Sequence, residues 1–147
     1  MSSFQLDLAY QQQSDWVRGY TLLLGQPKQV PDQAHYWKHG AGGYKSNIKD
    51  FARFAIALAN HEMLHDETTE QMWTPQTLKD GQRTTYGLGV VVEGKGQQLK
   101  ISHNGAQDET KTRMVFYPAS KHGVVVMSNS ANCDPGKVST AIFRAID

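Results

Sequence analysis

The sequence lacks three features that would each indicate a particular class of protein. It has a single cysteine, Cys133, so no disulfide bond can form within the chain. No apolar run approaches the roughly 18 residues that a membrane-spanning helix needs, and Met1–Gln13 has neither the basic nor the apolar block of a signal peptide. The formal net charge is +1, and there is no basic run. We therefore expect no membrane partner and no nucleic-acid partner.

Apolar residues are present in the proportion typical of a globular protein. They make up 39% of the 147 residues, which is enough for one hydrophobic core, and the chain is short for two domains. There is no internal repeat. The sequence predicts a single domain over residues 1–147.

The clearest local pattern lies in the second half of the chain. Thr112–Pro118 and Gly123–Ser128 are rich in β-branched and aromatic residues, and a short polar turn separates them. This pattern predicts an antiparallel hairpin. Two further strands are predicted before it, Tyr86–Val92 and Gln98–Ser102, with a glycine-containing turn between them. The second of these leads directly into His103.

Three helices are predicted from capping residues and from the helical spacing of apolar residues. The first covers about Asn47–Asn60 and has Ser46 as its N-cap. The second starts near Asp66–Thr68, where Thr68 and Gln71 offer a capping box, and ends before Pro75. The last follows Asp134 as N-cap. Its apolar stripe, expected to face the core, consists of Val138, Ala141, Ile142 and Ala145.

The first third of the chain carries weaker patterns. Tyr20–Leu24 predicts a short strand, and the Pro, Gly, Gln and His content of Gln26–Gly43 predicts a long loop. Tyr36 and Trp37 lie in this loop beside the glycine run Gly40–Gly43. Aromatic residues beside glycines suit the rim of a pocket, and packing against the core is the other interpretation. With the hairpin and helices, these elements predict an α+β fold, an antiparallel β-sheet flanked by helices.

One short motif has the spelling of a zinc site. His61–His65 matches H-E-x-x-H, in which two imidazoles on one unbroken helix bind zinc and the glutamate acts as general base. Asn60 and the new helix start near Asp66 predict a break within the motif, and no third ligand follows at the usual spacing. We expect no metal site, and a zinc peptidase is the second alternative function.

A second short motif, Ser46–Lys49, has the spelling S-x-x-K. In enzymes that use it, the serine is the nucleophile and the lysine takes its proton when burial lowers the lysine pKa. Here the serine is also the natural helix cap, and Lys49 lies on the polar side of the helix, where a lysine stays protonated. We interpret Ser46 as a cap.

Several segments, taken together in order, carry a resemblance to a known family. They are Val17–Tyr20, Gly40–Ser46, Asp50–Leu58, Met72–Pro75, Tyr86–Gly89, His103–Gly105, Phe116–Pro118 and Gly123–Asn129. They resemble the C-terminal half of the serine β-lactamase and penicillin-binding-protein-like family, nearest to its class C-like branch of esterases and D-aminopeptidases. The resemblance covers nearly the whole chain. It implies a partial β-lactamase/transpeptidase-like fold.

The resemblance also implies site residues. His103, Asn104 and Gly105 are similar to the H-x-G form of the family's third motif, which lies on a strand lining the active site. There it binds a substrate carboxylate or carbonyl, and the backbone N–H of the next residue, here Ala106, completes the oxyanion hole. The catalytic candidates are therefore His103, Gly105 and Ala106. The substrate-binding candidates are Asn104, Tyr36 and Trp37, and no cofactor is implied.

The departures from the family pattern limit the implied function. The catalytic S-x-x-K and Y-x-N of the family belong upstream of every matched segment, and Ser130–Asn132 has the S-x-N spelling in the wrong order. Asp108 and Glu109 stand where a glycine is usual, which would disfavour substrates that carry a carboxylate, such as β-lactams. The implied chain contributes the H-x-G wall of a serine hydrolase that cleaves an amide, lactam or ester through an acyl-enzyme, and it lacks the nucleophile. It is expected to be inactive alone. A catalytically silent binding module is the first alternative.

The expected partners are a small-molecule acyl substrate and a second polypeptide segment. Gly123–Ser128 is almost continuously apolar, as in a strand buried on both faces at the centre of a sheet. Without a neighbour, such a strand presents unpaired N–H and C=O groups that another chain can bind. We expect this edge to pair with the missing N-terminal half of the domain or with a second copy of the chain.

Overall fold

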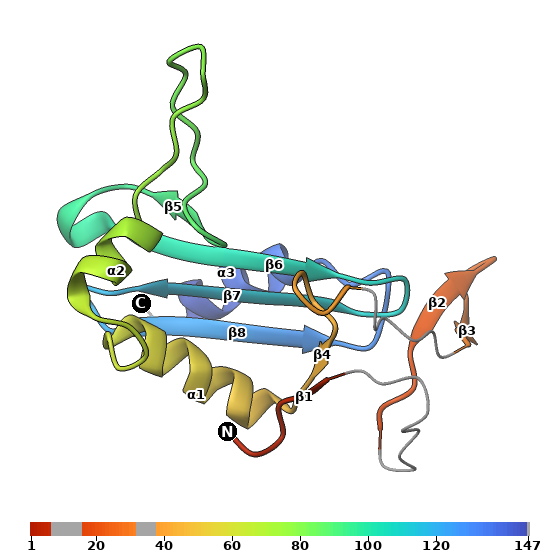
Figure 1. The fold of residues 1–147 in the computed structure, drawn as a ribbon. Helices are drawn as coiled ribbons and strands as arrows, with labels where there is room; N and C mark the ends of the chain where they lie inside the picture. Colours follow the sequence, from red (N-terminus) through yellow and green to blue (C-terminus); the bar gives the residue numbers. More distant parts are fainter. Residues whose placement is uncertain (7–15, 32–37, 147) are drawn as a thin grey trace.

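The computed structural model describes residues 1–6, 16–31 and 38–146. Its centre is a four-stranded antiparallel sheet with the order β5-β6-β7-β8 (Figure 1). These strands are β5 (Val91–Glu93), β6 (Lys100–Ala106), β7 (Lys111–Tyr117) and β8 (His122–Ser128). Two small sheets pair β1 (Gln5–Leu6) with β4 (Tyr44–Lys45) and β2 (Tyr20–Leu23) with β3 (Gln26–Gln29). The helices are α1 (Ile48–Ala59), α2 (Asp66–Met72) and α3 (Pro135–Ile146).

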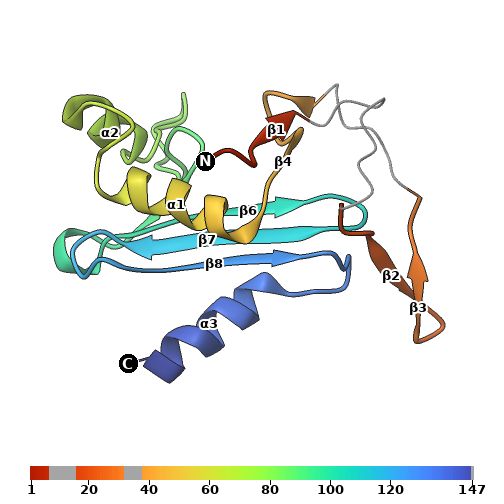
Figure 2. The same cartoon turned by 90° about the horizontal axis from the view of Figure 1, so that it is seen from below.

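The two faces of the central sheet carry separate clusters of buried side chains. Because side chains alternate along each strand, Ile101 and Phe116 lie on one face and Val115 and Val124 on the other. The first face packs against Ala55 and Leu58 of α1 in the main core, and Phe143 of α3 packs against the second. Figure 2 shows α1 and α2 on one side of the sheet and α3 on the other. The predicted α+β class, with helices flanking an antiparallel sheet, is confirmed.

The predicted hairpin is present, and its neighbours are shifted. β7 and β8 pair over their whole length. β6 continues four residues past the predicted end at Ser102, so the H-x-G sequence is part of the strand. The predicted strand Tyr86–Val92 is wrong over its first five residues, since β5 begins at Val91. There Gly87 N–H donates to Val90 C=O at 2.8 Å in a tight turn.

The starts of α1 and α3 follow the predicted capping chemistry, with a shift of one residue at α1. The N-cap of α1 is Asn47, whose side chain accepts from Asp50 N–H at 2.9 Å, and the prediction of Ser46 was wrong by one residue. Asn and Ser cap helices about equally well, so the sequence did not separate them. Asp134 caps α3 as predicted and accepts from Lys137 N–H at 3.0 Å. This backbone hydrogen bond lowers the pKa of Asp134.

α2 starts at Asp66, within the predicted range. The predicted capping box of Thr68 and Gln71 is wrong, because the N-cap of α2 is His65, which makes no side-chain capping bond.

The predicted core-facing stripe of α3 is also wrong. Its four residues, Val138, Ala141, Ile142 and Ala145, are exposed in the structure. Ser139 is the buried residue of the helix, and Phe143 one turn later packs on the sheet. α3 thus buries a narrow face through one small and one aromatic residue, and it leaves its aliphatic face uncovered within the described residues.

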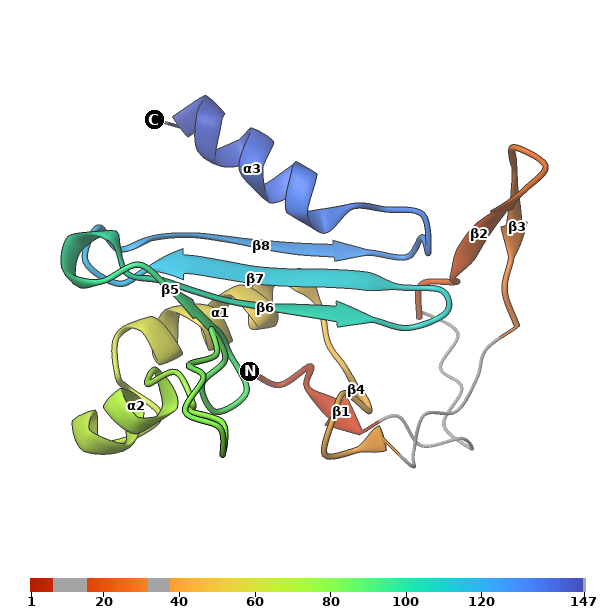
Figure 3. The ribbon, with the colours of Figure 1, turned by 90° about the horizontal axis from the view of Figure 1, so that it is seen from above.

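The long loop predicted over Gln26–Gly43 begins with a strand. β2 and β3 form a hairpin, and its two turn residues, Leu24 and Gly25, both have positive φ (51° and 78°). Positive φ at both positions is the requirement of a type I′ turn. Pro27 has no N–H to donate, and such a residue is tolerated in an edge strand. Figure 3 shows the hairpin projecting beyond the end of the sheet where β6 and β8 finish.

No helix in the described part of the chain is long and apolar enough to cross a membrane.

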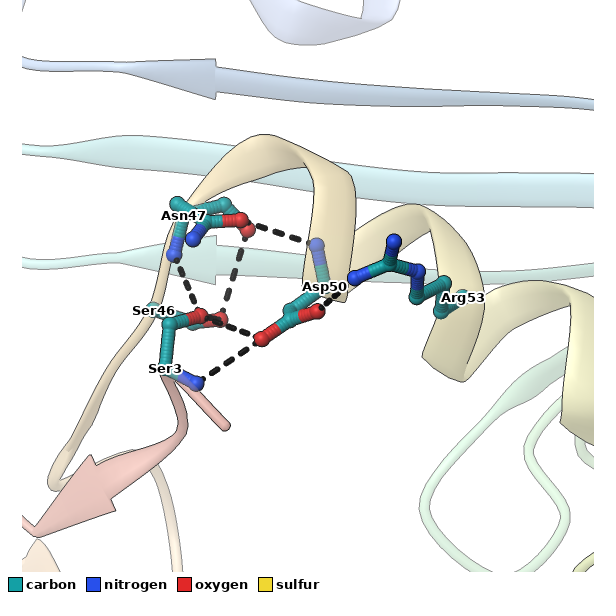
Figure 4. Close-up of polar contacts among 5 residues, drawn as sticks. All are labelled: Ser3, Ser46, Asn47, Asp50 and Arg53. Atoms are coloured by element: carbon teal, nitrogen blue, oxygen red, sulfur yellow. Dashed lines mark hydrogen bonds and ion pairs between the residues drawn. The ribbon is translucent and has the colours of Figure 1, made fainter. Parts of the chain in front are cut away.

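A buried carboxylate joins the N-terminal segment to the start of α1 (Figure 4). Asp50 is only 2% exposed, and its Oδ2 accepts from both the N–H and the hydroxyl of Ser3, each at 2.8 Å. Its Oδ1 lies 2.7 Å from the Arg53 guanidinium. The hydrogen bond from Ser3 N–H, then the Ser3 hydroxyl and Arg53, hold the pKa of Asp50 far below the usual range of a carboxyl.

We predict that Asp50 makes folding stability sensitive to acid. The folded-state pKa is depressed, so the contribution of the carboxylate is complete above the unfolded-state pKa of about 3.9. It is lost as the pH falls through that value toward the folded-state pKa. Asp50→Asn should be less stable than wild type at pH 7, and this difference should shrink between about pH 5 and pH 2. Urea unfolding at several pH values measures it. Asp80→Asn, at an exposed turn, is the control and should retain the wild-type acid dependence, and a constant Asp50→Asn difference at all pH values would refute the assignment.

Candidate functional site

The C-terminal end of β6 extends past its neighbour β5. The residues of β5, Val91–Glu93, pair only with Lys100–Ser102. On the other side, β6 pairs with β7 from Ile101 to Ala106. His103–Ala106 therefore has one edge within the sheet and one outer edge, along which no strand of the described residues lies.

The strand register determines which backbone groups point to this outer edge. Gln107 N–H donates to Thr110 C=O at 2.9 Å and so continues the ladder of β6 and β7. Hydrogen-bonded and non-hydrogen-bonded pairs alternate in an antiparallel ladder, so Gly105 bonds to β7 and Ala106 does not. The N–H groups of Asn104 and Ala106 therefore point away from β7. A strand-edge N–H in this orientation is suited to binding a carbonyl oxygen or a developing oxyanion.

His103 lies on the face of the sheet that packs against α1. It alternates with Ile101, which is fully buried in the core of that face. The His103 side chain is half-buried, and its Nε2 lies 3.1 Å from the hydroxyl oxygen of Tyr86. The two ring centroids are 6.3 Å apart. The structure thus brings an imidazole and a phenol together beside the outer edge of β6.

Gly105 lies on the same face and cannot carry a side chain without a change in its neighbour. A Cβ at this position would meet the Thr112 hydroxyl oxygen of β7, well inside van der Waals contact. The next nearest atom, Thr112 Cβ, would be 3.6 Å away, which is an ordinary contact. Gly105 therefore keeps this part of the strand flat beside His103.

Asn104 projects to the opposite face of the sheet. Its side-chain oxygen accepts from the Arg113 guanidinium at 2.6 Å, directly across the ladder. The side chain of this substrate-binding candidate therefore does not share a face with His103 and Gly105. Only its backbone lies along the outer edge with that of Ala106.

The turn after β6 contacts a glycine-rich segment. Gln107 accepts from Lys38 Nζ at 2.6 Å and donates to Gly42 C=O at 3.4 Å. The glycine run predicted as a rim therefore lies against the end of β6. Its two aromatic candidates, Tyr36 and Trp37, lie outside the described residues.

The acidic residues after β6 differ in their surroundings. Asp108 is exposed at the tip of the turn between β6 and β7, whereas Glu109 is half-buried. The Cβ and Cγ of Glu109 occupy the space in which a side chain on Gly19 would lie. The Glu109 side chain is therefore packed at the base of the β2–β3 hairpin.

The S-x-x-K spelling does not form a catalytic pair. The Ser46 hydroxyl lies 3.1 Å from that of Ser3 and donates to Asn47 C=O at 3.3 Å. Lys49 is exposed on α1. Ser46 thus belongs to the polar network at the start of α1 (Figure 4), on a different element from the outer edge of β6.

The H-E-x-x-H spelling lies in the loop between two helices, at the predicted break. α1 ends at Ala59, and α2 begins at Asp66 with His65 as its N-cap. His61 has a positive φ of 58° and lies 2.7 Å from an Asp66 carboxylate oxygen. Within the described residues there is no group of three or more His, Cys, Asp or Glu side chains that could hold a metal ion.

Sequence reasoning missed three residues of this site: Tyr86, Gln107 and Thr112. The predicted strand Tyr86–Val92 has Tyr86 as its first residue, Thr112 belongs to the predicted hairpin, and Gln107 carries no prediction. A signal for Tyr86 was available, because two glycines in Tyr86–Gly89 favour a turn over a strand. Only the strand register places Thr112 beside Gly105, and Gln107 joins the site through its contacts with Lys38 and Gly42.

Comparisons with known proteins give a family match and several similar folds. The family model described as Beta-lactamase matches residues 1–146. The chain is 26% identical over 109 residues to penicillin-binding protein 4* of Bacillus subtilis (strain 168), which is 74% of this chain and 24% of that protein. Its fold is similar to that of the octameric penicillin-binding protein homologue from Pyrococcus abyssi, with a TM-score of 0.77 at 19% identity over 99% of this chain and 34% of that one. It is also similar to a penicillin-binding protein from Bacillus halodurans, with a TM-score of 0.73 at 21% identity over 98% of this chain and 44% of that one. The chain thus spans between about a quarter and less than half of the length of these relatives.

We predict that Gly105→Ala destabilises the chain by about 1–3 kcal/mol, because the new methyl group overlaps the Thr112 hydroxyl. Thr112→Ala removes that oxygen, so the double variant should recover most of the loss beyond the cost of Thr112→Ala itself. Denaturant unfolding of the four proteins in this cycle measures the coupling. Gly40→Ala, where an added Cβ meets nothing within 4 Å, is the control and should stay close to wild type. Additive effects of the two substitutions would show that Thr112 does not limit Gly105.

Proposed function

Because the chain belongs to the Beta-lactamase family, we propose that it forms one wall of a serine hydrolase active site. In this proposal, a serine outside these 147 residues attacks an amide, lactam or ester carbonyl and forms an acyl-enzyme. The observation that supports this proposal most directly is the outer edge of β6, where the strand register directs the Ala106 N–H away from β7.

Each residue at this edge has a separate role in the proposal. The Ala106 N–H donates a hydrogen bond to the substrate oxygen and strengthens it as negative charge develops in the tetrahedral intermediate. Gly105, which has no side chain, allows the substrate to approach the strand backbone closely. His103 contributes a polar ring on the same face, suited to a carbonyl or carboxylate of the substrate. Asn104 contributes its backbone, since its side chain is held by Arg113 on the other face.

We further propose that the remainder of the domain covers the open side of β8. The strand has a paired edge toward β7 and, within the described residues, no strand on its other edge. Figures 2 and 3 both show α3 beside β8. Val138, Ile142 and Ile146 of this helix are exposed. An unpaired edge and an apolar helix face together match the strand and helix surfaces that complete an α+β layer. The chain covers 34% and 44% of the two related structures. The rest of those chains is long enough to supply a strand and a helix that cover β8 and α3.

The first prediction is that the isolated chain is not acylated. A serine-directed acylating reagent or a chromogenic lactam should give no stoichiometric mass increase, because Ser46 is bonded within the α1 cap network. A mass increase that disappears in Ser46→Ala would contradict this. The same chain joined to a family segment with S-x-x-K and Y-x-N should be acylated. Failure of that longer protein to react, while folded and stable, would favour a catalytically silent binding module.

The second prediction is that the isolated chain associates with itself when the rest of the domain is absent. Its mean mass by light scattering should rise over about a tenfold increase in concentration, because within the described residues β8 has an unpaired edge and α3 has an exposed aliphatic face. Ile142→Glu places a charge on the α3 face and should reduce this association. Ile56→Glu, at an exposed position of α1, is the matched control and should not. A monodisperse monomer at every concentration, with strongly protected amides at Val124–Val126, would show that β8 needs no partner.

A further inference from the structure

The Tyr86 side chain contacts His103 and has no role in the function proposed above. Its hydroxyl oxygen lies 3.1 Å from His103 Nε2, and the rings are inclined at 60°. This distance is within the range of a hydrogen bond to nitrogen. The two residues are 17 positions apart and come from different elements, so the contact depends on the fold.

The backbone of Tyr86 is held firmly. Its C=O accepts from Gln76 N–H at 2.8 Å and from the Thr84 hydroxyl at 3.0 Å, and its N–H donates to that same hydroxyl oxygen at 3.1 Å. Gly87 lies directly against Met72 C=O, with no space for a side chain. The phenol therefore extends from a fixed point, so its hydroxyl can determine where the imidazole rests.

The next residue fixes the same turn to α2. Leu88 N–H donates to Met72 C=O at 3.0 Å, at the last residue of the helix. Tyr86 and Val91 also form an isolated antiparallel bridge beside the start of β5. The turn is thus anchored both to α2 and to the sheet that carries His103.

We propose that Tyr86 is a positioning residue that sets the orientation and the tautomer of His103. A phenol is a stronger hydrogen-bond donor than a neutral imidazole, and an imidazole nitrogen is a stronger acceptor than a phenol oxygen. Tyr86 O–H therefore donates to Nε2, and the neutral ring carries its proton on Nδ1. The ring then offers Nδ1–H as its donor to a carbonyl or carboxylate.

This tautomer determines what His103 can do at the outer edge of β6. With Nε2 occupied by the phenol, neutral His103 donates a hydrogen bond to the substrate and does not accept a proton from it at that nitrogen. Ala106 N–H and His103 Nδ1–H are then two donors on one strand end, suited to a substrate with two acceptor oxygens. The role toward substrate rests on the proposed function, whereas the tautomer does not.

The tautomer can be measured on the chain alone. Labelling the histidines with ¹⁵N and recording long-range ¹H–¹⁵N spectra distinguishes the protonated ring nitrogen from the unprotonated one. Wild-type His103 should carry the proton on Nδ1 at a pH where the ring is neutral. In Tyr86→Phe the aromatic ring remains and the donor is lost, so the proton should move substantially to Nε2. An unchanged tautomer in Tyr86→Phe, or an Nε2–H ring in the wild type, would overturn the proposal.

Two controls separate positioning from a general structural effect. Tyr117→Phe removes a hydroxyl from a tyrosine of β7 that packs against Phe143, and it should leave the His103 tautomer unchanged. His122, exposed at the start of β8 and paired with Tyr117, serves as an internal reference for Tyr86→Phe, which should not alter it. A change at His122 in Tyr86→Phe would indicate a general rearrangement and would also overturn the proposal.

Activity of the longer, acylation-competent protein gives an independent readout. Removing one neutral hydrogen bond should lower kcat/KM between about twofold and tenfold, and Tyr117→Phe should not lower it. A tautomer change with unaltered kcat/KM would overturn the positioning role. A longer protein that is never acylated would count against the proposed function, while the tautomer measurement would still decide the contact between Tyr86 and His103.

Discussion

The pairing register between β6 and β7 is the constraint on which the candidate site depends. It places Ile101 and His103 on the α1 face, Asn104 on the α3 face, and the Ala106 N–H on the outer edge. A shift of one residue would move every one of these groups to the opposite face or edge. The shift is opposed by Ile101, which is fully buried and would move from the main core to the smaller cluster under α3. Packing of the core thus determines the chemistry of the strand end.

The sequence predicted those elements whose signals are local. The hairpin of β7 and β8, the position of α1 to within a residue, the start of α2 and the cap of α3 all follow from periodicity, turn residues and caps. The errors occurred where distant contacts decide. Asn47 and Ser46 are residue types that cap helices about equally well, so the sequence alone does not choose between them. The Ser46 hydroxyl instead contacts the hydroxyl of Ser3, which is far away in the chain. The aliphatic stripe of α3 has helical spacing, which predicts the helix. The spacing does not predict which surface packs against the stripe.

In the candidate site, too, local sequence signals and contacts between distant residues contribute differently. His103, Gly105 and Ala106 were identified by resemblance, and the ladder supplies their orientation. Tyr86 reaches His103 only because glycine turns and the end of α2 hold it there. As a catalytic motif, S-x-x-K needs a buried lysine. As a zinc site, H-E-x-x-H needs an unbroken helix. The fold provides an exposed Lys49 and a break after Ala59. A motif therefore indicates chemistry only when its local structure is the one that the chemistry needs.

The contact between Ser3 and Asp50 also has a consequence for the order of folding. It links residues 47 positions apart, whereas β7 and β8 are joined by a short turn. Closing a long loop costs more chain entropy than closing a short one, and local pairings generally precede distant ones. We expect the three-stranded meander of β6, β7 and β8 to form first and α1 to dock on it. The N-terminal segment would then join last, so early in folding Asp50 is a solvated carboxylate, and it becomes a buried one only when the first residues of the chain arrive.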